Sequence, residues 1–246
     1  MQLKIVIPSH KRHDNVITTK LVKNAIICVA ESQVDLYKDH NPDYEIVAHP
    51  DTIVGLIPKR NWMKKHFGDV FMLDDDVFMF HRLYMDIGDT AVIKSPAFIE
   101  NQIYSLYETA KLMGVPLFGF TKNPRPEQYN VFKPYRLDTC ITGCAYGVMG
   151  NADISWDEDF KLKEDFYISC IAKYKYRKIL VDTRFNFGQK DTFISSGGLA
   201  EIRNHDQEQR DMLRMRKNFG ECVTLKKDKA FAKSKVKNNI TIKFGF

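Results

Sequence analysis

The sequence predicts an α/β fold in which a mostly parallel sheet, flanked by helices, forms a single domain. Two observations support this prediction. Short apolar runs alternate with helix-like segments through residues 1–80, and one of these runs ends in three consecutive aspartates. Alternating strands and helices are typical of parallel sheets, because each crossover between parallel strands needs a dozen or more residues.

The first half of the chain supplies four apolar runs that we expect to be strands. They lie at residues 3–7, 25–29, 44–48 and 70–73. The segments between them suit helices, because Asp14 and Ser32 are good N-caps and Pro58 suits a first helical turn. The first of these helices is expected to run from Asp14 to about Asn24.

The second half is less regular but contains one clear amphipathic helix. Ser95 and Pro96 open it, apolar residues recur on one face, and Gly114 ends it. The remaining expected elements are a strand at 115–120, a small apolar stretch at 141–149, a helix at 164–174, a strand at 178–181, a Gly-rich turn at 195–198 and a charged helix at about 199–218.

Composition places the chain among ordinary globular proteins. Its 246 residues suffice for one core, and 44% of them are hydrophobic and 28% charged. No apolar run is long enough to span a bilayer, and the N-terminus lacks the features of a signal peptide. The five cysteines form no Cys-x-x-Cys pair, which favours reduced thiols over disulfides or a zinc site. We therefore expect a cytoplasmic protein with no membrane partner.

Positive charge is concentrated at the C-terminal end. The net charge is +6, and residues 224–246 hold seven lysines and one aspartate, so residues 1–223 are formally neutral. We expect one domain at 1–223 and a basic extension at 224–246. Such an extension suits a polyanionic partner, but a solvated segment that only aids solubility fits the charge equally well.

Polar segments follow three of the expected strands. Residues 9–12 follow the first strand, Glu31 follows the second and residues 74–76 follow the fourth. In an open α/β sheet, ligands bind outside the carboxyl ends of the strands. These segments are therefore expected to meet at one ligand-binding edge.

The three aspartates at residues 74–76 are the strongest sign of chemistry in the sequence. Adjacent carboxylates repel each other, and placing them at a buried strand end is costly unless a cation compensates. Alternation turns Asp74 and Asp76 to the same side. Oxygen ligands of this kind suit Mn²⁺ or Mg²⁺ that also binds phosphate oxygens. A solvated acidic turn is the alternative, and the position at the ligand edge favours the metal.

The motifs "IVIPSHKR", "IVGLIPKRNWM" and "VFMLDDDV" resemble a known family. Together they are similar to the nucleotide-sugar half of GT-A glycosyltransferases. They resemble in particular the TET-associated glycosyltransferases, whose phage members are thought to put sugars on 5-hydroxymethylpyrimidines in DNA. The resemblance is good over residues 1–80, the nucleotide-sugar half, and loose over residues 81–223, which would be the acceptor half.

The resemblance implies a role for particular residues. It assigns the nucleotide sugar to Pro8, Ser9, Arg12, Glu31, Arg60, Asn61, Asp74 and Asp75. It assigns the metal to Asp74 and Asp76, with His205 as a further ligand by analogy with late histidines in some GT-A enzymes. Taken alone, Arg60 would suit a surface salt bridge and His205 an ordinary surface position. Asn61 alone would suit a polar helix position. The position of Arg60 and Asn61 one helix before the acidic triplet favours the functional interpretation for these two residues, whereas His205 has no such support.

An acidic pair opens the helix expected at 164–174. The stretch "WDEDFKLKEDFYISC" resembles the GT-A segment in which such a pair lies near the acceptor. A carboxylate there can take the proton from the attacking hydroxyl, and Asp165 is the first candidate for this base, with Glu164 the second. Negative charge at a helix start is also favourable in itself, so helix capping is an equal alternative.

The acceptor is inferred from the resemblance, from the basic extension and from stretches such as "NPRPEQYNVFKPYR" and "AKYKYRK". Basic residues interleaved with aromatic ones suit a phosphate backbone and exposed bases. We expect transfer from a UDP-sugar, such as UDP-arabinose or UDP-glucose, to 5-hydroxymethylcytosine in DNA, in the host cytoplasm if a phage encodes the protein. A polysaccharide or protein acceptor is one alternative. A non-catalytic DNA-binding module with a degenerate GT-A fold is another.

Overall fold

The computed structural model describes residues 2–85, 91–141, 143–189, 204–225 and 240–242. The described strands are β1 (Lys4–Pro8), β2 (Ala25–Ala30), β3 (Glu45–His49), β4 (Val70–Leu73), β5 (Val77–Arg82), β6 (Leu117–Thr121), β7 (Tyr135–Arg136), β8 (Ala145–Val148), β9 (Leu180–Gln189), β10 (Val223–Leu225) and β11 (Ile240–Ile242). The described α-helices are α1 (Val34–His40), α2 (Leu56–Phe67), α3 (Pro96–Leu112), α4 (Glu164–Tyr176) and α5 (His205–Phe219).

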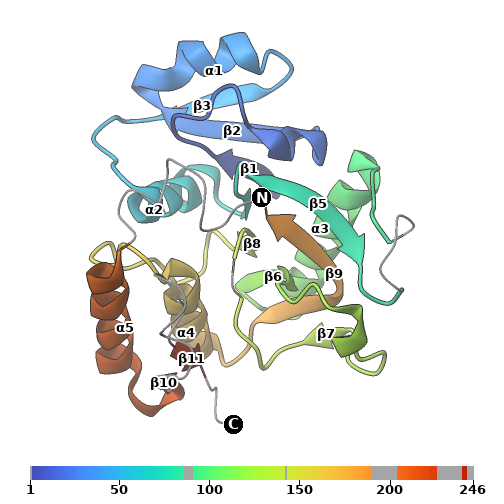
Figure 1. Cartoon of the computed structure of the whole chain (residues 1–246), viewed down its shortest axis with the longest axis vertical. Helices are drawn as coiled ribbons and strands as arrows, with labels where there is room; N and C mark the ends of the chain where they lie inside the picture. The colour runs from blue at the N-terminus through green and yellow to red at the C-terminus, as the bar shows by residue number, and fades with distance from the viewer. Residues whose placement is uncertain (1, 86–90, 142, 190–203, 226–239, 243–246) are drawn as a thin grey trace.

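The first four strands form the parallel part of the main sheet, as the sequence predicts. Their order is β3-β2-β1-β4, and each neighbouring pair runs parallel. Every residue of β2 and β4 is buried. Strands covered on both faces carry such continuous apolar runs, because neither face meets water. Figure 1 shows α1 alongside the β2 and β3 end of this sheet.

The rest of the sheet is mixed, and this mixing places two further segments at the ligand edge. The order continues β4-β8-β6-β9-β5, with β7 paired to β9. Strand β8 runs antiparallel to β4, so that Ala145 pairs with Leu73 and the N-terminal end of β8 lies beside the carboxyl end of β4. Strand β9 runs parallel to β6, so that its last residue, Gln189, comes to the same edge.

Aromatic rings fill the core under the second half of the sheet. The rings in mutual contact belong to Phe71, Phe80, Phe118, Phe120, Phe185 and Phe187. A Cβ atom at Gly147 would lie 2.1 Å from the ring of Phe118. The ring therefore packs on bare backbone, which leaves no room for a side chain at this position of β8.

One prediction about local structure is wrong, and another is right in kind but wrong in its bounds. The helix expected from Asp14 to Asn24 is only a short 3₁₀ turn at Ile17–Lys20. Thr18 Oγ1 donates to the carbonyl oxygen of Asp74 at 2.6 Å and accepts from the amide of Val77 at 2.9 Å, which holds this segment as a loop against the acidic triplet. The strand expected at 178–181 is instead the ten-residue β9.

The C-terminal part differs in detail from the expectation. Of the charged helix expected at about 199–218, the described part is α5, and the turn expected at 195–198 lies outside the described residues. Strands β10 and β11 form a separate two-stranded sheet, and β10 contains the boundary predicted at residue 223. All five cysteines are free. In the described part of the chain, no helix is both long and apolar enough to cross a membrane.

Candidate active site

Asp75 joins the loops that follow β1 and β4. Its carboxylate is buried, with Oδ2 accepting from Ser9 Oγ at 2.6 Å and Oδ1 accepting from Arg12 Nη1 at 2.7 Å. Hydrogen bonds to a carboxylate from charged donors are about twice as strong as neutral ones. Burial tends to lower the pKa of Arg12, but the nearby carboxylates, chiefly that of Asp75, together raise it by more. The pKa therefore rises overall, and Arg12 stays charged in this contact.

Ser9 is the centre of a small buried network. Its hydroxyl lies 2.7 Å from Tyr37 Oη, and its carbonyl oxygen accepts from Lys59 Nζ at 2.8 Å. Tyr37 is on α1 and Lys59 is on α2. Burial lowers the pKa of the Lys59 ammonium. The loop after β1 is therefore held by both helices of the parallel half, through Tyr37 and Lys59. The sequence resemblance assigns no role to either residue, although Lys59 lies within the motif "IVGLIPKRNWM".

Arg60 links the acidic triplet to α4 across the sheet. Its side chain is 1% exposed, and Nη2 lies 3.2 Å from Asp74 Oδ1 and 3.7 Å from Glu164 Oε1. The guanidinium carbon also lies 4.9 Å from the ring centroid of Tyr146. Burial opposes the charge on Arg60, but these neighbours raise its pKa overall, so the group remains a buried cation.

Asp74 and Asp76 turn to the same point, as alternation predicts. Gln189 Nε2 donates to Asp76 Oδ1 at 2.8 Å and to Asp74 Oδ2 at 3.3 Å. Burial raises the pKa of Asp74 to about 7, with Arg60 opposing the rise and Asp76 and Glu164 adding to it. Burial also raises the pKa of Asp76. Two crowded carboxylates of this kind are stabilised by a cation between them.

The acidic pair at residues 164–165 begins α4 and faces the same edge. The carboxylate of Glu164 lies against Arg60. Asp165 Oδ2 accepts from the amide of Gly143 at 2.9 Å, and its Oδ1 accepts from the amide of Phe166 at 2.8 Å. Gly143 has a φ of 102°, a left-handed conformation that favours glycine. The segment before β8 is thereby bent so that its amide meets Asp165.

Helix α5 fixes the position of this acidic pair. Asp211 Oδ2 accepts from the amides of Lys161 at 3.0 Å and Leu162 at 2.6 Å. Lys163, which has a φ of 65°, forms a buried ion pair with Glu208. The residues just before α4 are therefore held by two carboxylates of α5. The sequence predicts a charged helix here but not this function, because only the contact between two distant segments reveals it.

The family model of the TET-associated glycosyltransferases matches residues 3–198. The chain belongs to this family. The glycosyltransferase class predicted from the sequence motifs is therefore confirmed, and the match extends well beyond residues 1–80, where the resemblance was strongest. A comparison with curated protein sequences gave no match.

Two crystal structures of S. aureus TarS 1-349 are similar to this family member in fold. The complex with UDP-GlcNAc aligns with a TM-score of 0.54 at 12% identity, over 87% of this chain and 65% of TarS. A second structure aligns with a TM-score of 0.50 at 11% identity, over 76% of this chain and 59% of TarS. The chain thus spans less than two thirds of each TarS chain. The α/β fold predicted as GT-A is confirmed.

The structure places most of the predicted donor-site residues at one edge. Ser9, Arg12 and Asp75 are in mutual contact, and Arg60 meets Asp74. Pro8 ends β1 and exposed Glu31 follows β2, both at this edge.

Asn61 and His205 are placed differently. Asn61 Nδ2 donates to Trp156 O and Glu158 Oε1, each at 2.9 Å, and its Oδ1 accepts from Trp156 N at 2.9 Å. This amide therefore holds the loop that precedes α4. His205 begins α5, and its side chain lies outside the described part.

The carboxylates of Asp74 and Asp76 fit a divalent cation that is shared with a ligand. One oxygen of each carboxylate accepts a hydrogen bond from the same atom, the side-chain amide nitrogen of Gln189, so the two oxygens converge on one point. Among the described residues, no group of three or more His, Cys, Asp or Glu side chains is arranged to hold a metal on its own. Mg²⁺ and Mn²⁺ sites of nucleotide enzymes commonly use one or two carboxylates and complete their shell with phosphate oxygens and water.

The raised pKa of Asp74 predicts a specific pH dependence of stability in the metal-free protein. The unfolded chain ionises this carboxyl near pH 3.8 and the folded chain near pH 7. The folded state therefore holds the extra proton between these values, and its stability falls as the pH rises through this window. Asp74→Asn removes this titration. The stability of the variant relative to wild type should improve between pH 4 and pH 8 by about 1 to 4 kcal/mol.

Urea unfolding in the presence of a chelator, at several pH values, measures this difference. Asp39→Asn, at an exposed position of α1, is the control and should show no such trend. A stability difference between Asp74→Asn and wild type that is independent of pH would contradict the prediction.

Proposed function

We propose that this protein transfers a sugar from a UDP-sugar to 5-hydroxymethylcytosine in DNA. The observation that carries the proposal is the convergence of Asp74, Asp76, Arg60 and Asp165 at the carboxyl edge of the sheet, in a chain of the TET-associated glycosyltransferase family. Such edges are where open α/β sheets bind ligands.

The donor class is supported by the site and by the similar fold. The TarS structure with a TM-score of 0.54 is a complex with UDP-GlcNAc, and we infer that a UDP-sugar binds at the matching edge here. Arg12, whose side chain is 18% exposed, can bind the negative charge of a diphosphate once a ligand competes with its partner Asp75. UDP-glucose and UDP-arabinose are the first donors to compare.

We infer that Asp74 and Asp76 hold Mn²⁺ or Mg²⁺ when the donor is bound. A divalent cation there would offset the charge that develops on the leaving diphosphate. Their convergence, and the cost of keeping both carboxylates ionised without a cation, support this assignment. Arg60, behind Asp74, orients the carboxylate towards this position.

Asp165 is the proposed general base. Its two hydrogen bonds to backbone amides fix the carboxylate at the start of α4, where it can accept the proton of the acceptor hydroxyl. Glu164 is turned to the buried Arg60 instead, so it is suited to positioning. A 5-hydroxymethyl group lies in the major groove, so the enzyme must reach into the groove or extrude the base to bring this hydroxyl to Asp165.

Transfer of a radiolabelled sugar to DNA tests the acceptor. We expect incorporation into duplexes that contain 5-hydroxymethylcytosine and background incorporation into matched duplexes with cytosine, because only the former carry the nucleophilic hydroxyl. UDP-glucose and UDP-arabinose would be supplied in parallel. Equal incorporation into both duplexes, or transfer only to a polysaccharide or a protein, would refute the DNA acceptor without affecting the fold.

Removal of the cation tests the role of Asp76. Transfer should stop in a chelator and return with Mn²⁺ or Mg²⁺, and Asp76→Ala should lower kcat/KM by about 100-fold or more, as is usual for loss of a charge-stabilising group. Asp39→Ala on α1 serves as the matched control and should transfer like wild type. Full activity of Asp76→Ala in the presence of chelator would overturn the metal assignment.

Replacement of the two acidic residues of α4 tests the base. Asp165→Asn should lower kcat by about 10²- to 10⁴-fold with little change in the donor KM, since it removes proton transfer alone. Glu164→Gln removes one of the two carboxylate partners of the buried guanidinium of Arg60, so it should lower the free energy of unfolding and weaken donor binding more than it lowers kcat. The reverse pattern would assign the base to Glu164.

A further inference from the structure

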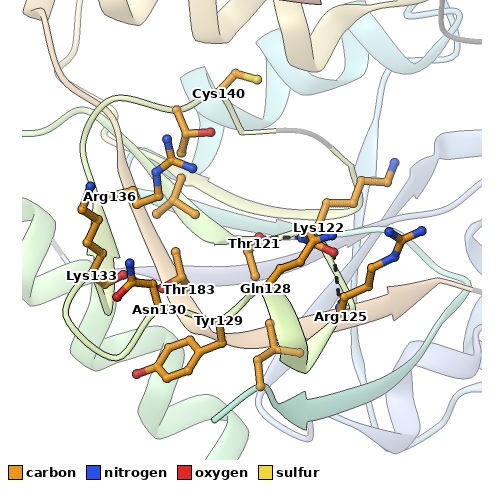
Figure 2. Close-up of a pocket in the computed structure, with 14 residues that line it drawn as sticks. Thr121, Lys122, Arg125, Gln128, Tyr129, Asn130, Lys133, Arg136, Cys140 and Thr183 are labelled. Atoms are coloured by element: carbon orange, nitrogen blue, oxygen red, sulfur yellow. Dashed lines mark hydrogen bonds between the residues drawn. The ribbon is translucent and has the colours of Figure 1, made fainter. Parts of the chain in front are cut away.

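A cavity of about 540 Å³ lies beside the candidate active site. It is formed by the carboxyl end of β6, by the chain from Lys122 to Cys140 and by Val181 and Thr183 of β9. Figure 2 shows Lys133 and Arg136 on one side of this pocket and Lys122 and Arg125 on the other. The pocket is built largely from the basic and aromatic stretch "NPRPEQYNVFKPYR".

The pocket carries net positive charge. Four of its lining residues are cationic, and none of the described residues that line it is Asp or Glu. Arg136 pairs with Asp138, whose side chain is 70% exposed and lies outside the lining. A site of this kind suits a polyanion, because each phosphate that it neutralises releases condensed counterions.

The pocket shares a wall with the proposed base. The side chain of Lys122 lies over Gly143, where a Cβ would meet its Cδ atom at 3.0 Å. The amide of Gly143 in turn donates to Asp165. Cys140, three residues before Gly143, lines the pocket. One residue, Gly143, therefore separates a lining side chain of the pocket from the carboxylate of Asp165.

Two apolar side chains project from the rim of the pocket. Phe132 is 90% exposed and Val131 is 66% exposed, and they lie between the lining residues Asn130 and Lys133. Asn130 shapes this tip, because its Oδ1 accepts from the amide of Phe132 and its carbonyl oxygen accepts from the amide of Lys133, each at 2.9 Å.

The tip is also tied to the sheet. Thr183 Oγ1 on β9 donates to the carbonyl oxygens of Lys133 at 2.8 Å and Pro134 at 3.0 Å. The next residues form β7, which pairs with β9. An apolar side chain is thus presented to solvent on an anchored turn, beside four cations, which is the arrangement by which proteins insert wedges between stacked bases.

We propose that this pocket binds the phosphodiester backbone of the acceptor strand and that Phe132 inserts among the bases beside the modified nucleotide; the inference rests on the proposed DNA acceptor. Extruding a base leaves a gap in the stack, and an aromatic ring can fill it. The four cations hold the strand while Phe132 separates the bases. A polyanion without bases would use the cations alone.

Binding measurements on the full chain test this proposal. A fluorescent duplex with one 5-hydroxymethylcytosine and a neighbouring 2-aminopurine reports affinity by anisotropy and unstacking by 2-aminopurine emission. Phe132→Ala should weaken binding by about tenfold or more and abolish the emission increase, with the salt dependence unchanged. Arg125→Gln and Lys133→Gln should each lower the slope of log Kd against log salt by about 0.9 for each phosphate that the variant no longer neutralises.

Matched controls are available elsewhere on the surface. Leu112→Ala removes another apolar side chain, which is 87% exposed at the end of α3, and Lys65→Gln removes an exposed cation of α2. Both should bind DNA like wild type. Hydrolysis of the UDP-sugar without acceptor should be equal in all variants and shows that the donor site is intact. Inorganic polyphosphate, as a competitor, tests binding that depends on charge alone.

The outcomes separate this inference from the proposed function. One outcome is that the wild-type chain transfers sugar to hydroxymethylated DNA, while Phe132→Ala and the two cation variants bind DNA like wild type. This outcome would overturn the inference and leave the proposed function standing. An effect of the cation variants alone, equal for DNA and polyphosphate, would assign the pocket to a polyanion without bases and would also overturn it. Absence of DNA binding and transfer by the wild-type chain would refute both.

Discussion

The buried guanidinium of Arg60 is the interaction on which the candidate site depends. It comes from α2 in the parallel half of the chain, and it meets Asp74 after β4 and Glu164 at the start of α4. Removing a cation from water costs several kcal/mol unless its partners are well placed. The two acidic segments therefore cannot separate without leaving this charge uncompensated. One side chain therefore ties the carboxylate of Asp74 to the start of α4.

Sequence patterns predicted the parts of the site that follow directly from local order. Four apolar runs predicted the parallel strands, and the acidic triplet at residues 74–76 lies at the edge where strand ends meet. Gln189 could not be found this way, because its role depends on β9 running ten residues to the same edge. The local sequence around Thr18 predicts a helix. The segment is instead a loop because Thr18 forms hydrogen bonds to Asp74 and Val77, which lie far away in the chain and which local patterns cannot reveal.

Opposite charges are divided between two neighbouring surfaces. Carboxylates crowd the edge at Asp74 and Asp76, whereas cations line the pocket beside it, and Gly143 lies between them. If the acceptor is the polyanion proposed above, the basic pocket would attract its phosphates and the acidic edge would repel them. Under that proposal, the donor and the acceptor would approach Asp165 from different sides.

The pairing of β4 has a consequence for how the protein can be made or divided. Every residue of β4 is buried, with β1 on one side and β8 on the other, and β8 is encoded more than 70 residues later. When only the first 80 residues have left the ribosome, β8 is not yet present to pair with β4. One edge of this apolar strand is then unpaired, and unpaired strand edges tend to pair with other chains. Residues 1–80 are therefore not an excisable module, and fusions or split versions of the protein need to keep β4 and β8 in one piece.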